Sequence, residues 1–371
     1  MEFYRKLQEF KSFNLQSYLD SIAPHHIEAI LAKDNVTELD FPALLSDAAL
    51  EYLEPMAQRA ATITRKQFGN VIFLFTPLYI SNYCENTCRY CSFACTHNIE
   101  RRHLSPREIR EEAQKIGDTG MRHILLLTGE SSKKATLEYI TDAVALCRDY
   151  FSSIGIEIYP LTEEGYGRCV AEGVDSLTIY QEVYDETIYH ELHRGGPKDN
   201  YRFRLEAPDR ACRQNVHSLT IGALLGLHDF RKEAFALALH LRHIQNTWPA
   251  TEVSVSLPRI RPLVQDFALP DPVSDKRFVQ LLTAFRIAFP SVGITISTRE
   301  SKEFRNNILP LGVTRMSAGV STAVGGHSQA PSTTQFEIAD SRSLEEMKRD
   351  LLRAGFQPVT YDWNSRLLIN S

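Results

Sequence analysis

The sequence has no apolar run that approaches the roughly 20 residues of a membrane-spanning helix. Its first residues, Met1 to Lys6, lack the apolar segment of a secretory signal peptide. We therefore expect neither a membrane protein nor an exported one, and we predict a cytoplasmic location. The chain has 7 cysteines, and an odd number without an export signal argues against a framework of disulfides. Their thiols are thus expected to be reduced.

The chain also lacks a strong excess of either charge, because 41 Lys and Arg stand against 46 Asp and Glu. The formal net charge of −5 predicts no nucleic-acid partner and no anionic membrane partner. No short repeat, heptad pattern or long low-complexity tract is present. With 371 residues and 43% hydrophobic side chains, the sequence is typical of a globular protein with a large core.

What the chain does contain is a group of three thiols, Cys84, Cys88 and Cys91, in C-x3-C-x2-C spacing. Three close thiolates can each bind one iron of a [4Fe–4S] cluster, which normally takes four cysteine ligands. The fourth iron then stays open to a substrate or cofactor. Zinc is the main alternative, because Cys95 and His97 are near enough to complete a closed shell of four ligands. Incidental thiols on an extended loop are a third reading, and the spacing favours the cluster.

From Val71 onward, apolar segments with the length of strands alternate with amphipathic segments with the length of helices. Near-continuous apolar strands separated by helices indicate a parallel sheet that helices cover. Eight such pairs predict an α/β fold that closes as a (β/α)8 barrel of the TIM type. An open doubly wound sheet is the alternative, but no strand precedes the G-x-G-x-x-G of a dinucleotide site. The expected strands are 71–75, 123–128, 155–159, 176–180, 218–222, 252–256, 293–297 and 314–318.

The helices between these strands carry clear start signals. Ser105 and Glu108 form a capping box with proline at the first helical position, and that helix should end near Gly120. We divide the chain into three parts: a helical lead-in (1–66), the barrel (67–320), and a closing part of loop, last helix and tail (321–371). The other expected helices are 136–151, 163–172, 201–214, 232–248, 275–289, 302–309 and 343–354.

Polar side chains follow the predicted strands at the end where an α/β barrel carries its active site. The cysteine loop follows the first strand. Gly129 and Glu130 follow the second strand, where glycine permits a close backbone approach and a carboxylate can accept hydrogen bonds from an ammonium group. Glu182 ends the fourth strand. The next helix carries Arg202, Arg204 and Arg210, and a guanidinium there can bind a carboxylate through two hydrogen bonds.

A second pair of polar residues follows the last two strands. Arg299 and Ser317 should face the same mouth of the barrel, where a guanidinium and a hydroxyl can clamp a carboxylate. The alternative is a weak surface ion pair between Arg299 and Glu300. We predict that Arg299 and Ser317 bind the substrate.

The cysteine spacing, with Tyr90 just before the third cysteine, resembles the signature of the radical S-adenosylmethionine (SAM) superfamily. This resemblance implies that the three cysteines hold a [4Fe–4S] cluster whose open iron binds the amino and carboxylate groups of SAM. An electron from the cluster then cleaves SAM to methionine and a 5′-deoxyadenosyl radical. The resemblance also implies that Tyr90 lies at the SAM site, that Gly129 and Glu130 hold the amino group and that Glu182 holds the ribose. Of the three arginines, it favours Arg204 for the carboxylate, and we expect Arg202 and Arg210 to be surface charges.

Longer segments resemble the 2-iminoacetate synthase family, the tyrosine lyases of thiamine biosynthesis: 81–93, 125–130, 180–184, 297–301 and 361–364. The resemblance implies that L-tyrosine loses a hydrogen atom from its amino nitrogen and that its Cα–Cβ bond breaks. The products are 2-iminoacetate (dehydroglycine) and a 4-hydroxybenzyl fragment that ends as p-cresol. Thiazole synthase would receive the dehydroglycine, and flavodoxin or ferredoxin would donate electrons.

Two related activities and two other classes of protein are the alternatives. The tryptophan lyase of indolic-acid biosynthesis has a similar amino-acid clamp. The hydrogenase-maturation tyrosine lyase has a further cysteine-bearing C-terminal segment, whereas no cysteine follows Cys212 here, which disfavours it. An iron–sulfur electron carrier without radical chemistry would not need a barrel of this size. A zinc-stabilised binding module would be colourless, whereas an iron–sulfur protein is brown.

Overall fold

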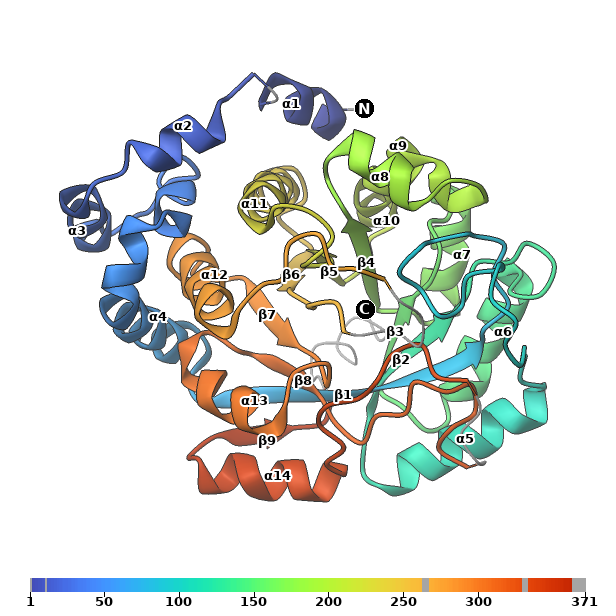
Figure 1. The fold of residues 1–371 in the computed structure, drawn as a ribbon. Coiled ribbons are helices and arrows are strands. Elements are labelled where there is room, and N and C mark those ends of the chain that lie inside the picture. Colours follow the sequence, from blue (N-terminus) through green and yellow to red (C-terminus); the bar gives the residue numbers. More distant parts are fainter. Residues whose placement is uncertain (1, 11, 262–266, 329–332, 362–371) are drawn as a thin grey trace.

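Residues 2–10, 12–261, 267–328 and 333–361 are described by a computed structural model (Figure 1). Eight parallel strands follow one another around a closed barrel, in which β1 pairs with both β8 and β2. Figure 1 shows these strands at the centre of a ring of helices, which confirms the predicted (β/α)8 barrel. The strands are β1 (Val71–Ser81), β2 (His123–Thr128), β3 (Ser153–Glu157), β4 (Ser176–Glu182), β5 (Ser218–Ala223), β6 (Glu252–Ser256), β7 (Gly293–Ile296) and β8 (Arg315–Ser317).

Helices cover the outer face of the barrel, as a parallel sheet that is buried on both faces requires. Many begin where a Ser, Thr or Asp side chain accepts a hydrogen bond from the first turn, and Ser105 and Glu108 form the expected capping box of α5. These helices are α5 (Pro106–Asp118), α6 (Leu137–Cys147), α7 (Glu163–Glu172), α8 (Glu186–Leu192), α9 (Tyr201–Leu205), α10 (Ala207–Arg213), α11 (Phe230–Thr247), α12 (Asp275–Ala288), α13 (Lys302–Ile308) and α14 (Leu344–Arg353), with the 3-10 turns η3 (Pro197–Asp199) and η4 (Leu309–Leu311).

The N-terminal helices form an additional layer outside α11 and α12 (blue in Figure 1). Phe3 stacks on His240 of α11 with ring centroids 4.0 Å apart, and Phe41 packs on Phe285 of α12 at 4.8 Å. These buried aromatic contacts hold the lead-in against the barrel. The elements are α1 (Glu2–Phe10), α2 (Leu15–Asp20), α3 (Pro24–Ala32), η1 (Pro42–Leu45), η2 (Ala48–Tyr52) and α4 (Leu53–Phe68).

The first strand continues to Ser81, past its predicted end at Phe75. Pro77 does not interrupt it, because the pairing with β8 ends at Phe75 and no donor is required at Pro77. A further short strand, β9 (Gln357–Val359), pairs with the start of β1. Its three residues are too few to give a periodic signal, and the sequence did not predict it.

The segment after β4 also differs from its prediction. The helix expected over residues 201–214 is divided into α9 and α10 at Glu206, because Pro208 cannot continue a helix interior. The short helix α8 before it was not predicted. Together these elements bring residues 183–200 against the cysteine loop, where Thr87 Oγ1 donates to the carbonyl of Arg194.

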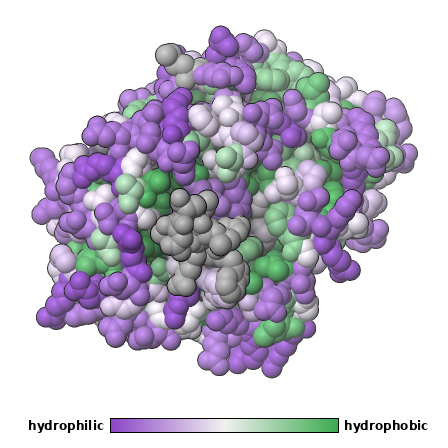
Figure 2. Space-filling model, turned by 180° about the vertical axis from the view of Figure 1, so that it is seen from behind, coloured by the Kyte–Doolittle hydropathy of each residue, from purple (hydrophilic) through white to green (hydrophobic). Residues whose placement is uncertain are grey.

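Figure 2 shows one face of the molecule, with hydrophilic side chains over most of its rim and hydrophobic ones nearer its centre. Within the described ranges, no helix is long and apolar enough to cross a membrane. Cys147, Cys169 and Cys212 are buried in helices, where they pack as small apolar side chains. Residues 362–364, which belong to one of the family-like segments, lie outside the described residues.

Candidate active site

The cysteine loop begins directly after β1, at the end of the strand where a barrel of this type carries its active site. Backbone hydrogen bonds fix its path, since Arg89 N donates to Leu192 O at 3.2 Å and Cys95 N donates to Asn86 O at 2.8 Å. The guanidinium of Arg101 donates to several further carbonyls of the loop. Hydrogen bonds within the protein therefore fix the conformation of the cysteine loop.

The side chains of Cys84, Cys88 and Cys91 line one cavity, and Cys95 is exposed outside it. Burial raises the pKa of the Cys88 thiol to about 12 and also raises that of Cys91, so their thiolates need a metal. In the described part of the chain, no three His, Cys, Asp or Glu side chains converge on one metal ion. A [4Fe–4S] cube binds each thiolate to a different iron. The three cysteines therefore fit the [4Fe–4S] cluster.

Gly129 and Glu130 connect the end of β2 to the cysteine loop. A Cβ atom at Gly129 would collide with the backbone of Tyr83, so this packing requires glycine. The Glu130 carboxylate lines the same cavity as the sulfur atoms and accepts a hydrogen bond from Asn86 Nδ2 at 2.7 Å. Its backbone oxygen accepts from Glu85 N at 2.7 Å. The glycine thus serves the contact between strand end and loop, and the carboxylate is held in place.

Glu182 ends β4 in a left-handed conformation, with φ +70°, that residues other than glycine rarely adopt. The pairing of β4 with β5 shifts register between Tyr180 and Glu182, so the strand bulges there. Lys198 Nζ lies 2.7 Å and Arg204 Nη2 3.6 Å from Glu182 Oε1. Burial by itself raises the pKa of this carboxyl, but the two cations outweigh it and the pKa is lowered. Backbone strain of this kind is typical of functional sites.

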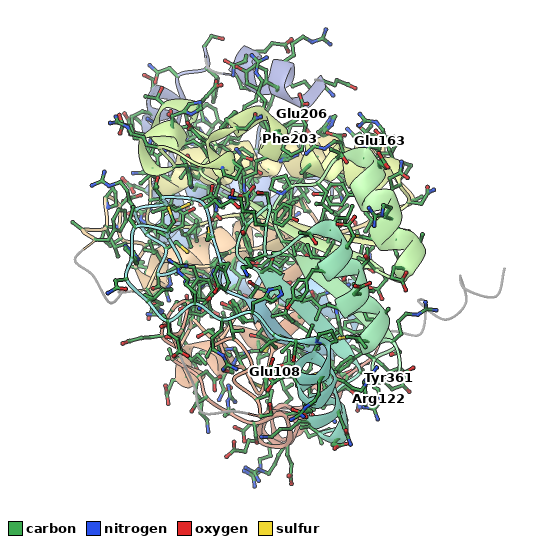
Figure 3. All side chains as sticks on the ribbon, turned by 90° about the vertical axis from the view of Figure 1, so that its right-hand side faces the viewer. Glu108, Arg122, Glu163, Phe203, Glu206 and Tyr361 are labelled. Atoms are coloured by element: carbon green, nitrogen blue, oxygen red, sulfur yellow. The ribbon has the colours of Figure 1, made fainter. Side chains whose placement is uncertain are left out.

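The three arginines after β4 have different surroundings. Arg204 is buried and its Nε donates to the carbonyl of Tyr180 at 2.6 Å. Arg202 is exposed, as predicted. The prediction for Arg210 is wrong in its detail, because the guanidinium is half-buried, packs on the ring of Phe203 at 4.0 Å and donates to backbone carbonyls. Phe203 is labelled in Figure 3, on α9.

Two adjoining cavities occupy the barrel mouth. The cluster cavity is lined by Cys84, Cys88, Gly129, Glu130 and Arg204. The barrel cavity extends between the strands. The structure brings all the predicted site residues to these two cavities. Tyr90, Arg299 and Ser317 line the barrel cavity, and the side chains that line both are Tyr79, Cys91, Leu127, Glu157, Thr178, Tyr180, Glu182, Lys198 and Gln335.

Arg299 and Ser317 present unused hydrogen-bonding groups to the barrel cavity. The guanidinium of Arg299 lies over the ring of Phe336 at 3.5 Å and has no hydrogen bond or ion pair from its side chain to the described residues. Ser317 Oγ accepts from Thr298 N at 3.2 Å, which leaves its proton free to donate. The pair is therefore arranged to receive an anionic group.

The surface ion pair between Arg299 and Glu300 is absent, because Glu300 is held elsewhere. Arg259 Nε donates to its Oε1 at 2.9 Å and Arg261 Nη2 donates to its Oε2 at 3.1 Å. Arg261 Nε also donates to the backbone carbonyl of Arg299. These contacts fix the backbone of Arg299 and leave its side chain to the cavity.

Three residues of the site were not predicted. Lys198 comes from the segment after α8, whose structure the sequence did not reveal. The same segment provides His193, whose Nε2 lies 2.7 Å from the hydroxyl of Tyr90. Glu157 ends β3 and lines both cavities. A carboxylate within the otherwise apolar segment 154–158 was the signal that could have identified it.

Comparison with known families agrees with this geometry. Residues 78–241 match the model of the radical SAM superfamily, and residues 256–357 match that of the biotin and thiamin synthesis associated domain. The 2-iminoacetate synthase of Salmonella typhimurium is 38% identical over 92% of this chain and 91% of its own length. That of Escherichia coli is 37% identical over the same shares of the two chains.

Solved structures show the same fold. A crystal structure of HydG, a maturase of the [FeFe]-hydrogenase, superposes with a TM-score of 0.87 and 30% identity over 99% of this chain and 81% of its own. A structure of methylornithine synthase superposes with a TM-score of 0.70 over 90% of this chain and 96% of its own. At 22% identity, the second likeness is evidence for the fold alone.

Proposed function

This chain belongs to the 2-iminoacetate synthase family of the radical SAM superfamily, and we propose that it cleaves the Cα–Cβ bond of L-tyrosine. The products are 2-iminoacetate and p-cresol, with SAM converted to 5′-deoxyadenosine and methionine, and 2-iminoacetate serves thiazole formation in thiamine biosynthesis. The observation that carries the proposal is the junction of the two cavities at Cys91 and Glu182. Cluster ligands and an amino-acid clamp thereby face one continuous space.

The cluster cavity binds the cofactors. Cys84, Cys88 and Cys91 hold the [4Fe–4S] cluster, which with SAM supplies the radical that removes a hydrogen atom from the substrate nitrogen. Glu130 receives the amino group of SAM, and Arg204 its carboxylate through charge-assisted hydrogen bonds. Glu182 accepts from the ribose hydroxyls, Gly129 keeps the strand end against the cysteine loop, and Tyr90 lies at the border with the barrel cavity.

The barrel cavity binds tyrosine. Arg299 and Ser317 hold its carboxylate and thereby fix the adjacent amino group, because abstraction of a hydrogen atom requires near-contact geometry. Gln335 and Phe336 line the same cavity, and Tyr79 donates from its hydroxyl to Gln335 Oε1 at 2.7 Å. These side chains shield the reacting atoms from water and from stray hydrogen donors.

Two protein partners belong to the proposal. Thiazole synthase would take 2-iminoacetate directly, because an imine hydrolyses in water, and flavodoxin or ferredoxin would reduce the cluster. Anaerobic gel filtration and cross-linking with thiazole synthase test the hand-over. No association in either measurement would remove direct transfer from the proposal and leave the lyase reaction intact.

A single anaerobic assay tests the reaction. The protein with reconstituted cluster receives SAM, dithionite and L-tyrosine, and p-cresol, 5′-deoxyadenosine and glyoxylate, the hydrolysis product of 2-iminoacetate, are measured together. We expect all three. 5′-Deoxyadenosine without p-cresol would contradict the choice of substrate, and L-tryptophan would be tested next. An intact cluster that does not cleave SAM would contradict the roles of the three cysteines.

A further inference from the structure

Glu157 is a carboxylate in the barrel interior for which the proposed function has no role. It ends β3, lines both cavities, and has no side-chain hydrogen bond or ion pair with the described residues. Removal of a carboxylate from bulk water is costly unless a partner compensates it. A carboxylate left without a partner at the junction of two cavities therefore indicates a bound cation or hydrogen-bond donor.

The charges around Glu157 are arranged asymmetrically. Lys198 and Arg204 both pair with Glu182, which leaves Arg299 as the remaining cation that acts on Glu157. Burial and Glu182 raise the pKa of Glu157 to about 7, and the three cations oppose this rise. The charged and titratable groups that face it are Glu182, Arg299, Arg204, Lys198, Tyr79 and Tyr180.

A bound amino acid would place opposite charges next to these two residues. When Arg299 and Ser317 hold the substrate carboxylate, the ammonium group lies one carbon atom away. Arg299 repels that ammonium, and Glu182 is already neutralised by its own cations. Among the described residues that line both cavities, Glu157 is thus the carboxylate with an unused charge.

We propose that Glu157 binds the ammonium group of the substrate and accepts one of its protons. The inference rests on the proposed function, since it assumes an amino acid clamped by Arg299. In this step an N–H bond breaks and an O–H bond forms, the nitrogen keeps the electron pair, and no oxidant is needed. The neutral amine then faces the cluster cavity, and Glu157 later returns the proton to solvent.

Glu157→Gln is the test variant, because it removes the charge and the proton acceptor and preserves the shape. The cluster-containing protein with SAM and no reductant is titrated calorimetrically with L-tyrosine and with 3-(4-hydroxyphenyl)propionate, which lacks the amino group. We expect the wild type to prefer L-tyrosine by about tenfold or more, the worth of one charged hydrogen bond. The variant should lose this preference and still bind the analogue.

Asp175→Asn is the matched control. Asp175 is another carboxyl whose pKa burial raises, to about 6, and it lies outside both cavities. The control should retain the preference for L-tyrosine. A Glu157→Gln variant that also retains it would overturn the inference. The inference would also fail if Glu157→Gln bound L-tyrosine and the analogue equally less tightly and no longer preferred L-tyrosine to L-phenylalanine. Glu157 would then bind the phenol hydroxyl.

The pH dependence of kcat/KM gives a second measurement, because it reports groups of the free enzyme. In the wild type the rate should fall as the pH drops below about 7, where Glu157 becomes protonated. This acid limb should be absent from Glu157→Gln and present in Asp175→Asn; its persistence in Glu157→Gln would overturn the proton transfer. Absence of p-cresol from the wild type would instead contradict the proposed function, and the binding comparison would still report on the ammonium contact.

Discussion

The cluster cavity and the barrel cavity treat their charged side chains in opposite ways. In the cluster cavity, Glu130 is bound by Asn86, and Glu182 is bound by Lys198 and Arg204. In the barrel cavity, Arg299 has no such side-chain partner among the described residues, and neither has Glu157, which lines both cavities. Arg315, by contrast, also lines the barrel cavity and pairs with Glu252 Oε1 at 2.8 Å. Contacts within the protein therefore fix the charged groups of the first cavity before a ligand binds. The second cavity leaves Arg299 and Glu157 to be neutralised by a ligand.

This difference follows from what each cavity must do. Preorganised dipoles and charges stabilise a bound cofactor without rearrangement during the reaction. A site for a zwitterionic substrate instead gains specificity when its charges are satisfied only by the correct ligand, because a wrong ligand leaves them unpaired. Substitutions in the cluster cavity should thus affect every step, whereas those in the barrel cavity should affect the substrate alone.

The largest effect should come from Cys88→Ala. With two thiolates left for the cluster, we expect loss of SAM cleavage and of most of the visible absorption after reconstitution. Cys95→Ala is the control and should keep both, because Cys95 lies outside the cluster cavity. SAM cleavage at wild-type rate by Cys88→Ala would remove this cysteine from the cluster ligands.

Arg299→Lys should impair the function of the barrel cavity and spare that of the cluster cavity. An ammonium group cannot reproduce the two hydrogen bonds of a guanidinium to a carboxylate, so p-cresol formation should fall about a hundredfold. The cluster absorption and the affinity for SAM should be unchanged. Arg202→Lys, on an exposed side chain, is the control. Wild-type turnover of tyrosine by Arg299→Lys would exclude Arg299 from the clamp.

The sequence was sufficient to predict the barrel and much of the site, because both depend on local patterns. Apolar strands, capped helices and the position of each polar residue after its strand place Cys84, Glu130 and Arg299 at one end of the barrel. Parallel strands all end at the same edge, so residues distant in sequence meet there. The role of each residue stays a prediction that the variants test.

What the sequence could not predict depends on tertiary contacts. Lys198 reaches Glu182 because the segment after β4 folds over the cysteine loop, and no periodic pattern marks that path. The pairing of Glu300 with Arg259 and Arg261 likewise involves residues far apart in sequence, and it decides that the side chain of Arg299 stays available. Ion pairs between loops are set by how the loops pack.

Lys198→Met should have a moderate effect and tests whether the cluster cavity is held by its internal pairs. Without Lys198, Glu182 loses its nearest cation, at 2.7 Å, and its orientation toward the cofactor. We expect the affinity for SAM to fall about tenfold, the worth of one charged hydrogen bond. Lys232→Met, on the exposed side of α11, is the control. Unchanged SAM affinity would show that Arg204 alone is sufficient to hold Glu182 in place.

The smallest effect should be on stability, and it concerns the unpaired carboxylate of Glu157. The pKa of Glu157 is about 7 in the folded protein and about 4.3 in an unfolded chain. The folded state therefore binds the proton more tightly, and the stability that this provides is complete below about pH 4.3 and lost as the pH rises to about 7.

Glu157→Gln removes this loss of stability at high pH, because the glutamine amide carries no charge at any pH. Without substrate, the melting temperature of the cluster-containing variant should exceed that of the wild type by roughly 1–3 °C at pH 8, and by less at pH 5. Saturating L-tyrosine should reverse the order at pH 8, because the ligand compensates the charge in the wild type alone. A variant less stable than the wild type at pH 8 without ligand would mean that Glu157 already has a partner inside the protein. The contrast between the two cavities would then fail at that residue.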